Sequence, residues 1–224
     1  MIVTIDGPAG SGKSTIAEIL AEKLGFIHFN SGSLYRGVTA YLLKQNFDIE
    51  SITSRSNIPD FNIEVNMIDG VQHVIVNSID FTNVLRDNQI STLVAFVAAN
   101  KFCREKIDKC QKQFCSSHNV VMEGRDLGSF VFPNAEVKFY LDCSAEERAK
   151  RRFNEEKLKN SNITFNEIKK QIIERDNIDK NRSIAPLVVP HDAIIVDSTN
   201  LNIDEVTKIT LKYINEHISN KTHM

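Results

Sequence analysis

A glycine-rich stretch near the amino terminus constrains the fold of this chain more than any other feature. Residues 7–15 read Gly-Pro-Ala-Gly-Ser-Gly-Lys-Ser-Thr, directly after the apolar run Ile2–Ile5. The spacing fits Gly-x-x-x-x-Gly-Lys-Ser/Thr, which is typical of a loop whose backbone N–H groups surround phosphate oxygens. Apolar residues then recur at helical spacing from Ile16 to Leu24, and the positive end of a helix there would also attract phosphate. The pattern predicts a strand, a phosphate-binding loop and a helix in succession.

Two side chains of this loop are suited to phosphate chemistry. Lys13 is placed to reach the outer phosphates of a nucleoside triphosphate, and the Ser14 hydroxyl is placed to ligate Mg²⁺. A glycine-rich turn that matches by chance is the alternative. The apolar strand before the loop and the helical pattern after it argue against that alternative.

The composition bounds the class of protein. The 224 residues are 42% hydrophobic and 25% charged, with a net charge of −2. These values are ordinary for one folded domain, and the near-neutral charge argues against nucleic acid or a membrane surface as a partner. No apolar run approaches the roughly 20 residues that a membrane-spanning helix needs.

The four cysteines indicate the compartment. They form no Cys-x-x-Cys pair and have no histidine cluster beside them. We therefore expect reduced thiols rather than zinc ligands or disulfides, and a cytoplasmic location. The sequence has no heptad repeat, so we expect a monomer.

Five short apolar runs predict the strands of a parallel sheet. They lack regular polar alternation, as expected where helices cover both faces, and helical segments separate them. The runs are Ile2–Ile5, Phe26–Phe29, Val120–Met122, Val137–Leu141 and Ala193–Val196. Because ligands bind beyond the carboxyl ends of such strands, the polar segments that follow them are candidates for the site.

One region departs from this α/β pattern. Apolar residues alternate with polar ones from Phe61 to Met67, Asp69-Gly70 follows, and Val71–Val76 continues as a β-rich segment. This arrangement predicts a small antiparallel insert at about 60–85 with an Asp-Gly turn.

A second region, at 144–186, also departs from the alternation of strands and helices. Capping-box patterns begin at Ser144 and at Thr164, and they predict two charge-rich helices separated by Asn160-Ser161-Asn162. Few large apolar residues lie in 146–162. We therefore expect this helix pair to be weakly tied to the core and to act as a mobile flap.

Arginines narrow the type of reaction. Arg36 follows a Ser-Gly turn, and Arg125 lies in Gly-Arg-Asp directly after a predicted strand. Arg175, Asp179 and Arg182 stand at i, i+4 and i+7, so they share one helical face. That spacing alone more often indicates a solvent-exposed helical face. Several cations near strand ends are what a protein needs to bind a second phosphate-bearing substrate.

Motifs in order along nearly the whole chain resemble those of the bacterial cytidylate kinases, in the nucleoside monophosphate kinase group. The matching stretches are Thr4 to Thr15, Ser31-Gly32-x-x-Tyr35-Arg36, Val97-Ala98-Ala99, Gly124-Arg125-Asp126, Val131-Phe132-Pro133, Glu147-Arg148-Ala149-x-Arg151-Arg152, Glu174-Arg175-Asp176, Asn181-Arg182-x-x-Ala185-Pro186-Leu187 and Asp197-Ser198-Thr199. The resemblance implies transfer of the γ-phosphoryl group of Mg·ATP to CMP or dCMP.

The resemblance also implies an architecture. The expected fold is a three-layer α/β P-loop fold with a central parallel sheet, a small antiparallel β insert and a helical lid. The whole chain would form a single kinase unit with its core at about 1–30, 87–144 and 186–224. The region that binds the monophosphate, with the insert, would lie at about 31–86, and the lid at about 145–185.

Residue roles follow from the same resemblance. Those implied for catalysis are Lys13, Arg36, Arg125 and Arg175. Those implied for ATP are Gly7, Pro8, Ala9, Gly10, Ser11, Gly12, Lys13, Ser14, Thr15 and Arg151, with Ser14 on Mg²⁺. Those implied for CMP are Ser31, Tyr35, Arg36, Arg104, Arg125, Asp126, Arg175, Asp179 and Arg182. A carboxylate such as Asp126 can accept a hydrogen bond from the amino group of cytosine. Uracil carries a carbonyl at that position, which an ionised carboxylate would repel.

Three positions depart from the family pattern, and two alternatives stay open. Asn30, Ala95 and Ile178 stand where many relatives carry Asp, Ser and Arg. Ala95 lacks the hydroxyl that would contact the sugar, which leaves the balance between CMP and dCMP undecided. Ile178 leaves the lid with one cation fewer. A kinase of the same architecture could use UMP or AMP. A P-loop module that signals by conformation and hydrolyses slowly would not need a second set of arginines.

Overall fold

The computed structural model describes residues 1–52, 58–158 and 163–222. The chain divides into two compact units. The first unit contains Met1–His28 and Val120–Met224, and the second contains Phe29–Asn119. The segment Asn160-Ser161-Asn162, predicted to separate two helices, lies outside the described residues. The predicted division into core, monophosphate-binding region and lid stays a prediction.

A five-stranded parallel sheet forms the centre of the fold, in the order β2-β6-β1-β7-β8. The strands are β1 (Ile2–Asp6), β2 (Ile27–Asn30), β6 (Val120–Glu123), β7 (Val137–Asp142) and β8 (Ile194–Asp197). All five predicted strands are confirmed. Each observed strand ends one residue later than predicted, on a polar residue, because the backbone pairing continues past the last apolar side chain.

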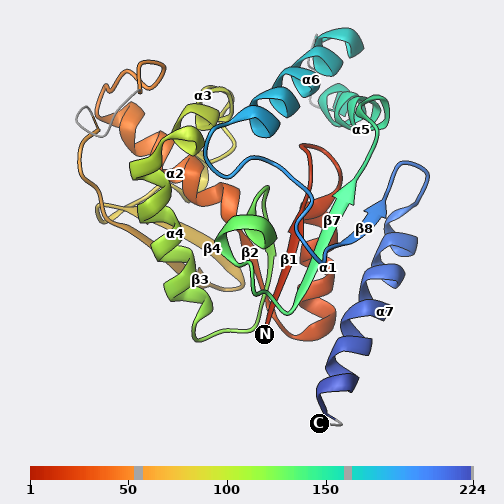
Figure 1. Cartoon of the computed structure of the whole chain (residues 1–224). Helices are drawn as coiled ribbons and strands as arrows, with labels where there is room; N and C mark the ends of the chain where they lie inside the picture. The colour runs from red at the N-terminus through yellow and green to blue at the C-terminus, as the bar shows by residue number, and fades with distance from the viewer. Residues whose placement is uncertain (53–57, 159–162, 223–224) are drawn as a thin grey trace. The chain divides into compact units, whose positions relative to one another are not determined.

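Helices of the first unit cover one face of this sheet. Helix α1 (Lys13–Leu24) packs on β6 and against α7 (Ile203–Thr222), which also reaches β7 (Figure 1). Apolar residues of β1, such as Val3 and Ile5, meet Leu20 of α1 and Ile214 of α7 in one buried cluster. This packing holds the end of β1, and with it the phosphate-binding loop, in a fixed position.

Two further helices of the first unit follow β7. They are α5 (Ala145–Leu158) and α6 (Phe165–Asn181), as the capping-box patterns predict. The box at Thr164 is complete, because Thr164 and Glu167 each bond the other's backbone N–H. Ala149, Ile168 and Ile172 form a small apolar cluster of their own between the two helices. The pair therefore has its own core.

The second unit contains the predicted insert. Helices α2 (Ser31–Lys44), α3 (Asn88–Ala99) and α4 (Lys101–Cys115) accompany an antiparallel sheet of β3 (Ile63–Ile68), β4 (Val71–Val76) and β5 (Ile79–Asp80). Asp69 and Gly70 both have positive φ and join β3 to β4, so the Asp-Gly turn is confirmed. The α/β class, the parallel sheet flanked by helices and the small antiparallel sheet are all as the sequence predicts.

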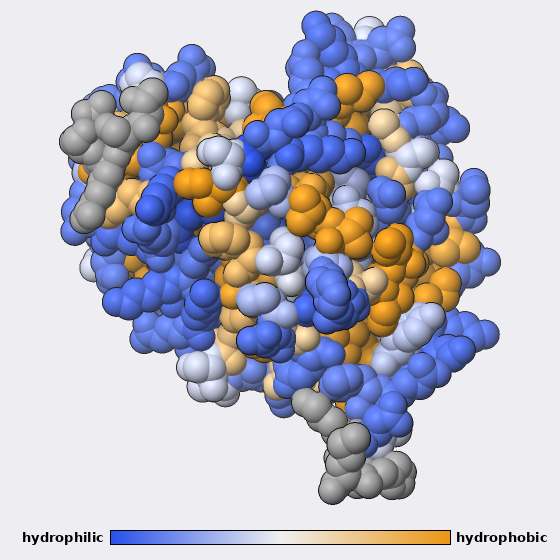
Figure 2. All heavy atoms as spheres, in the orientation of Figure 1, coloured by the Kyte–Doolittle hydropathy of each residue, from blue (hydrophilic) through white to orange (hydrophobic). Residues whose placement is uncertain are grey.

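The outer strand of the parallel sheet has an apolar surface. Ile195 of β8 is 60% exposed, and Figure 2 shows hydrophobic side chains at the surface around β8. Within the part of the chain that the structure describes, no helix has the length and apolar character to cross a membrane.

Gly37 provides a test of the packing in the second unit. A Cβ at this position of α2 would lie 2.4 Å from Cγ1 of Val74 in β4. In an open helix, Gly→Ala stabilises by about 1 kcal/mol. We expect Gly37→Ala instead to destabilise by about 1–3 kcal/mol, because the added methyl overpacks the helix–sheet contact.

The measurement is the free energy of unfolding from denaturant titration. Val74→Ala provides the matched background, since it removes the clashing methyl groups. In that background Gly37→Ala should raise stability. A single Gly37→Ala variant more stable than the parent protein would show that this contact is not tight.

Candidate functional site

The loop between β1 and α1 takes the shape that phosphate binding requires. Gly7 has φ +148°, and a Cβ there would lie 2.2 Å from the carbonyl oxygen of Leu141 in β7. Gly12 has φ +93° and caps the amino terminus of α1. Only glycine meets both conditions without strain. The predicted strand, loop and helix are thus present, with the helix amino terminus at the end of the loop.

Lys13 lies across this loop and is almost completely buried. Its Nζ donates to the carbonyl oxygen of Pro8 at 2.6 Å and to Oγ of Ser11 at 3.4 Å. Burial lowers the pKa of Lys13 well below its ordinary value, and the positive charge of Arg125 lowers it further, while Glu123 acts in the opposite direction. A bound phosphate would add negative charge and favour the ammonium form.

Ser14 donates its hydroxyl proton to Oε2 of Glu123, at 2.6 Å. Glu123 is the last residue of β6, the strand beside β1, and is 5% exposed. Glu123 is not among the site residues predicted from the sequence. The signal was available, because an acidic residue that ends a buried strand next to the phosphate-loop strand is a recurrent partner of Mg²⁺ in P-loop proteins.

The donors at this point fit Mg²⁺. Ser14 offers a hydroxyl and Glu123 a carboxylate, and hard oxygen donors are what this ion prefers. Mg²⁺ in nucleotide sites is held by one or two such groups together with phosphate oxygens and water. Among the described residues, no group of three or more His, Cys, Asp or Glu side chains could hold a metal.

Asp6 fixes the turn that directly follows Arg125 and Asp126. Its two carboxylate oxygens accept hydrogen bonds from the backbone N–H groups of Leu127 and Gly128, at 2.9 and 2.7 Å. These residues begin a single π-helical turn, Leu127–Val131, after β6. Burial raises the pKa of Asp6 to about 6, although the two N–H groups oppose that rise.

A network of three arginines and two aspartates joins this turn to α6. Oδ2 of Asp179 accepts from Nε of Arg125 at 3.1 Å and from Nε of Arg175 at 3.4 Å. Arg182 donates to Oδ1 of Asp126 at 2.7 Å. Burial tends to raise the pKa of Asp179, but the three arginines hold it below its ordinary value. The structure therefore brings together all five residues that the sequence analysis singled out in these two segments.

Arg148 has a role that the sequence analysis missed. Its guanidinium forms a bidentate pair with Asp176 of α6. It also donates to the carbonyl oxygens of Ala9, in the phosphate loop, and of Cys143. Arg148 is buried, so this pair connects the loop to α6 through groups shielded from water.

Arg151, one turn later, lies beside the other end of the loop. It donates to the carbonyl oxygen of Ser198 at 2.7 Å and pairs with Glu147. Ser198 in turn donates to the carbonyl oxygen of Ser11. Gly12 is the next loop residue, and a Cβ there would meet a guanidinium nitrogen of Arg151 at 3.8 Å. Arg151 is therefore placed next to the phosphate-binding loop.

The remaining predicted site residues belong to the second unit. Ser31 is buried at the start of α2, which Asn30 caps by accepting from the N–H of Ser33. The Arg36 guanidinium folds back over this first turn, since a Cβ at Gly32 would lie 3.0 Å from it.

Arg104 and Tyr35 lie together within the same unit. The Arg104 guanidinium lies 5.5 Å from the centre of the Tyr35 ring and donates to the carbonyl oxygen of Ala98. Arg104 is only 2% exposed. Helical spacing alone indicates an exposed residue there, so its burial is a finding of the structure. Tyr35 donates to Asp108 at 3.4 Å.

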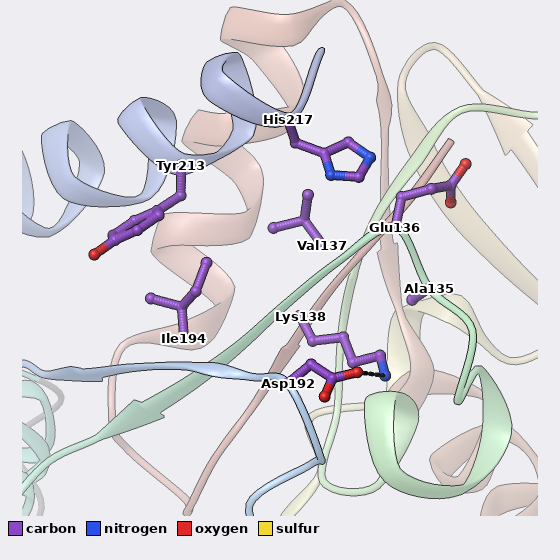
Figure 3. A pocket seen from close by; sticks show the side chains of 8 residues that line it. All are labelled: Ala135, Glu136, Val137, Lys138, Asp192, Ile194, Tyr213 and His217. Carbon is purple, nitrogen blue, oxygen red and sulfur yellow. Dashed lines mark ion pairs between the residues drawn. The ribbon is translucent and has the colours of Figure 1, made fainter. Parts of the chain in front are cut away.

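A cavity of about 180 Å³ lies in the first unit at the amino-terminal end of β7 (Figure 3). The phosphate loop lies at the opposite, carboxyl end of that strand. Lys138 pairs with Asp192, and Glu136 accepts from the backbone N–H of Ile2. These charged lining residues already have partners, whereas Nε2 of His217, which also lines the cavity, is buried without a hydrogen-bond partner among the described residues.

Comparisons with known proteins find relatives along nearly the whole chain. The family model described as cytidylate kinase matches residues 3–216. The cytidylate kinase of Caldicellulosiruptor bescii is 40% identical over 98% of this chain and 97% of its own length. The cytidylate kinase of Clostridium botulinum is 43% identical over 91% and 93%. An uncharacterized protein from Eubacterium ventriosum, at 14% identity, shares the fold with a TM-score of 0.50 and coverage of 96% and 98%.

The raised pKa of Asp6 predicts a pH dependence of stability. The folded protein binds this proton more tightly than the unfolded chain, with a pKa of about 6 against an ordinary 3.8. The contribution of Asp6 to the free energy of unfolding is therefore fully present below about pH 4 and is lost as pH rises through 6. The difference is about 3 kcal/mol.

The measurement is the difference in unfolding free energy between the parent protein and Asp6→Asn, from pH 4 to pH 7. This difference should fall as pH rises. Asp197→Asn is the control, because hydrogen bonds from Thr199 lower the pKa of that exposed carboxyl, so its difference should not fall. A flat profile for Asp6→Asn would contradict the assignment.

Proposed function

Because this chain belongs to the cytidylate kinase family, we propose that it transfers the γ-phosphoryl group of ATP to CMP or dCMP, with ADP and CDP or dCDP as products. The observation that carries the proposal beyond family membership is the pairing of Asp126 with Arg182. A carboxylate oxygen and a guanidinium N–H side by side match the amino group and the ring N3 of cytosine, one as acceptor and one as donor.

Gly7 to Thr15 are the proposed binding site for the phosphates of ATP. The loop glycines bring backbone N–H groups close to the phosphates, and Lys13 neutralises the charge that develops on the outer ones. Arg151, placed beside Gly12, is a further proposed contact of the donor.

Ser14 and Glu123 are the residues that would hold Mg²⁺, Ser14 through its hydroxyl and Glu123 through its carboxylate. Mg²⁺ held there would offset the negative charge of the phosphates during transfer.

The arginine network is the proposed site for the acceptor. Arg125 would hold its phosphate, and Arg175 with Asp179 would reach its sugar and phosphate. Asp179 keeps both guanidinium groups in place through one shared oxygen, so little reorientation is needed when a phosphate binds. For Ser31, Tyr35, Arg36 and Arg104 we propose contacts with CMP on the family resemblance.

No general base is needed for this reaction. The second pKa of a phosphate monoester is about 6, so CMP is largely a dianion at neutral pH and is itself a competent nucleophile. Catalysis then consists of in-line positioning and charge neutralisation by Lys13, Arg36, Arg125 and Arg175. Water must also be excluded from the site, because it would compete with CMP as the acceptor. The proposed lid is the helix pair α5 and α6, which carries Arg151 and Arg175.

The remaining proposals concern binding partners, oligomeric state and location. The substrates are small molecules, and a net charge of −2 gives no general attraction for nucleic acid. We propose that the protein acts as a monomer in the cytoplasm.

ADP formation with a panel of acceptors tests the function. The panel is CMP, dCMP, UMP, AMP and GMP with Mg·ATP, beside a reaction without acceptor. CMP and dCMP should stimulate ADP formation strongly. The best rate with UMP or AMP would move the assignment to another monophosphate kinase, and turnover independent of acceptor would indicate a hydrolytic switch.

Asp126→Asn tests how the base is chosen. Asn keeps the size of Asp126 and an oxygen for Arg182, but its amide can donate to the carbonyl of uracil. We expect the ratio of kcat/KM for CMP over UMP to fall by about 10-fold or more, because hydrogen-bond mismatch is a strong discriminator.

Asp192→Asn is the matched control, since Asp192 pairs with Lys138 at the amino end of β7. Its ratio of kcat/KM for CMP over UMP should equal that of the parent protein. An unchanged ratio in Asp126→Asn would remove Asp126 from base recognition.

A further inference from the structure

The two oxygens of the Glu123 carboxylate have different partners. Oε2 accepts from the Ser14 hydroxyl at 2.6 Å, and Oε1 lies 3.3 Å from Nε2 of His28. His28 is in β2, the strand on the other side of β6 from β1. Three neighbouring segments of the first unit therefore meet at one buried carboxylate.

The direction of the second hydrogen bond follows from the state of the carboxylate. Oε2 of Glu123 already accepts the Ser14 proton, so this carboxylate acts as an acceptor toward its neighbours. An ionised carboxylate can only accept hydrogen bonds. Nε2 of His28 is therefore the donor, whichever charge the ring carries.

The orientation of Glu123 determines what Ser14 can offer to a cation. While the Ser14 proton points at Oε2, the lone pairs of its oxygen are left for a metal ion. A carboxylate held by one donor can turn about its terminal torsion, which is broad. A second donor on the other oxygen fixes that torsion, as partners behind metal ligands commonly do.

We propose that His28 is a positioning residue that fixes the Glu123 carboxylate, so that the Ser14 hydroxyl presents its lone pairs to the Mg²⁺ of a bound nucleotide. This inference rests on the proposed binding of Mg·ATP at Ser14. It adds a residue of β2, outside the phosphate-binding loop, to the groups that control the metal.

Nucleotide binding at controlled Mg²⁺ concentration tests the inference without a turnover assay. The measurement is the affinity for a fluorescent ATP analogue, without Mg²⁺ and across a Mg²⁺ titration. In His28→Phe, which keeps an aromatic ring but removes the donor, the half-saturating Mg²⁺ concentration should rise about 3- to 10-fold. Affinity without Mg²⁺ should stay the same.

Two further variants separate positioning from a general effect on folding. His28→Gln restores an N–H donor and should return the half-saturating concentration to within about 2-fold of the parent protein, since one donor replaces another. His73→Phe is the matched control, because His73 also lies in a strand, bonds a carboxylate, Asp80, and has 26% side-chain exposure against 27% for His28. It should behave as the parent protein.

The outcomes are distinct. Equal Mg²⁺ dependence in the parent protein and His28→Phe overturns the role of His28 and leaves the magnesium site standing. Failure of His28→Gln to rescue overturns it too, since an N–H donor at this position would then not be what sets the Mg²⁺ dependence. Absence of any Mg²⁺ effect in the parent protein overturns the magnesium assignment itself, and this inference with it.

Discussion

Buried carboxylates at the carboxyl ends of the parallel strands are the constraint on which the rest of this structure depends. An ionised carboxylate in the interior costs several kcal/mol unless charges and hydrogen bonds compensate it. Asp6 has two backbone N–H groups as partners, and Glu123 has a hydroxyl and an imidazole. These requirements fix the segments around the sheet edge, because the partners come from α1, from β2 and from the turn after β6.

The same pairing prepares the proposed chemistry. Asp179 holds Arg125 and Arg175 together, and Asp126 holds Arg182, so cations that would repel one another stay close. Phosphates that arrive there meet groups already oriented, which lowers the reorganisation that phosphoryl transfer requires. Arg148 contributes differently, since its pair with Asp176 links α6 to the phosphate loop through Ala9. Arg148 thus connects the loop between β1 and α1 to α6 directly.

The sequence was sufficient where the signal is local. The phosphate loop, the Asp69-Gly70 turn and the Thr164 capping box depend on residues at most a few positions apart, and the structure has all three. The five strands were also predictable, because parallel strands are apolar runs. Their last residues were not, because Asp6 and Glu123 are polar residues whose strand pairing is set by neighbours far along the chain.

Contacts between residues far apart in the chain could not be predicted from the sequence alone. Arg148 could pair with Glu residues on its own helix or with Asp176, which is 28 residues away, and only the packing of α5 on α6 decides. Glu123 and His28 are 95 residues apart. For Arg125 and Asp179, spacing placed each on a suitable segment but could not show that they touch. The family resemblance supplied their roles, which remain proposals.

The central claim is that these charges bind a triphosphate donor and a cytidine-bearing acceptor at the same time. The most direct measurement is the affinity for adenosine and cytidine joined through five phosphates, a single molecule that spans both substrates. The account predicts binding at least about 100-fold tighter than ATP, because joining the two substrates removes the entropy cost of one association. It also predicts weaker binding of the uridine counterpart. An affinity no greater than that for ATP would contradict the account.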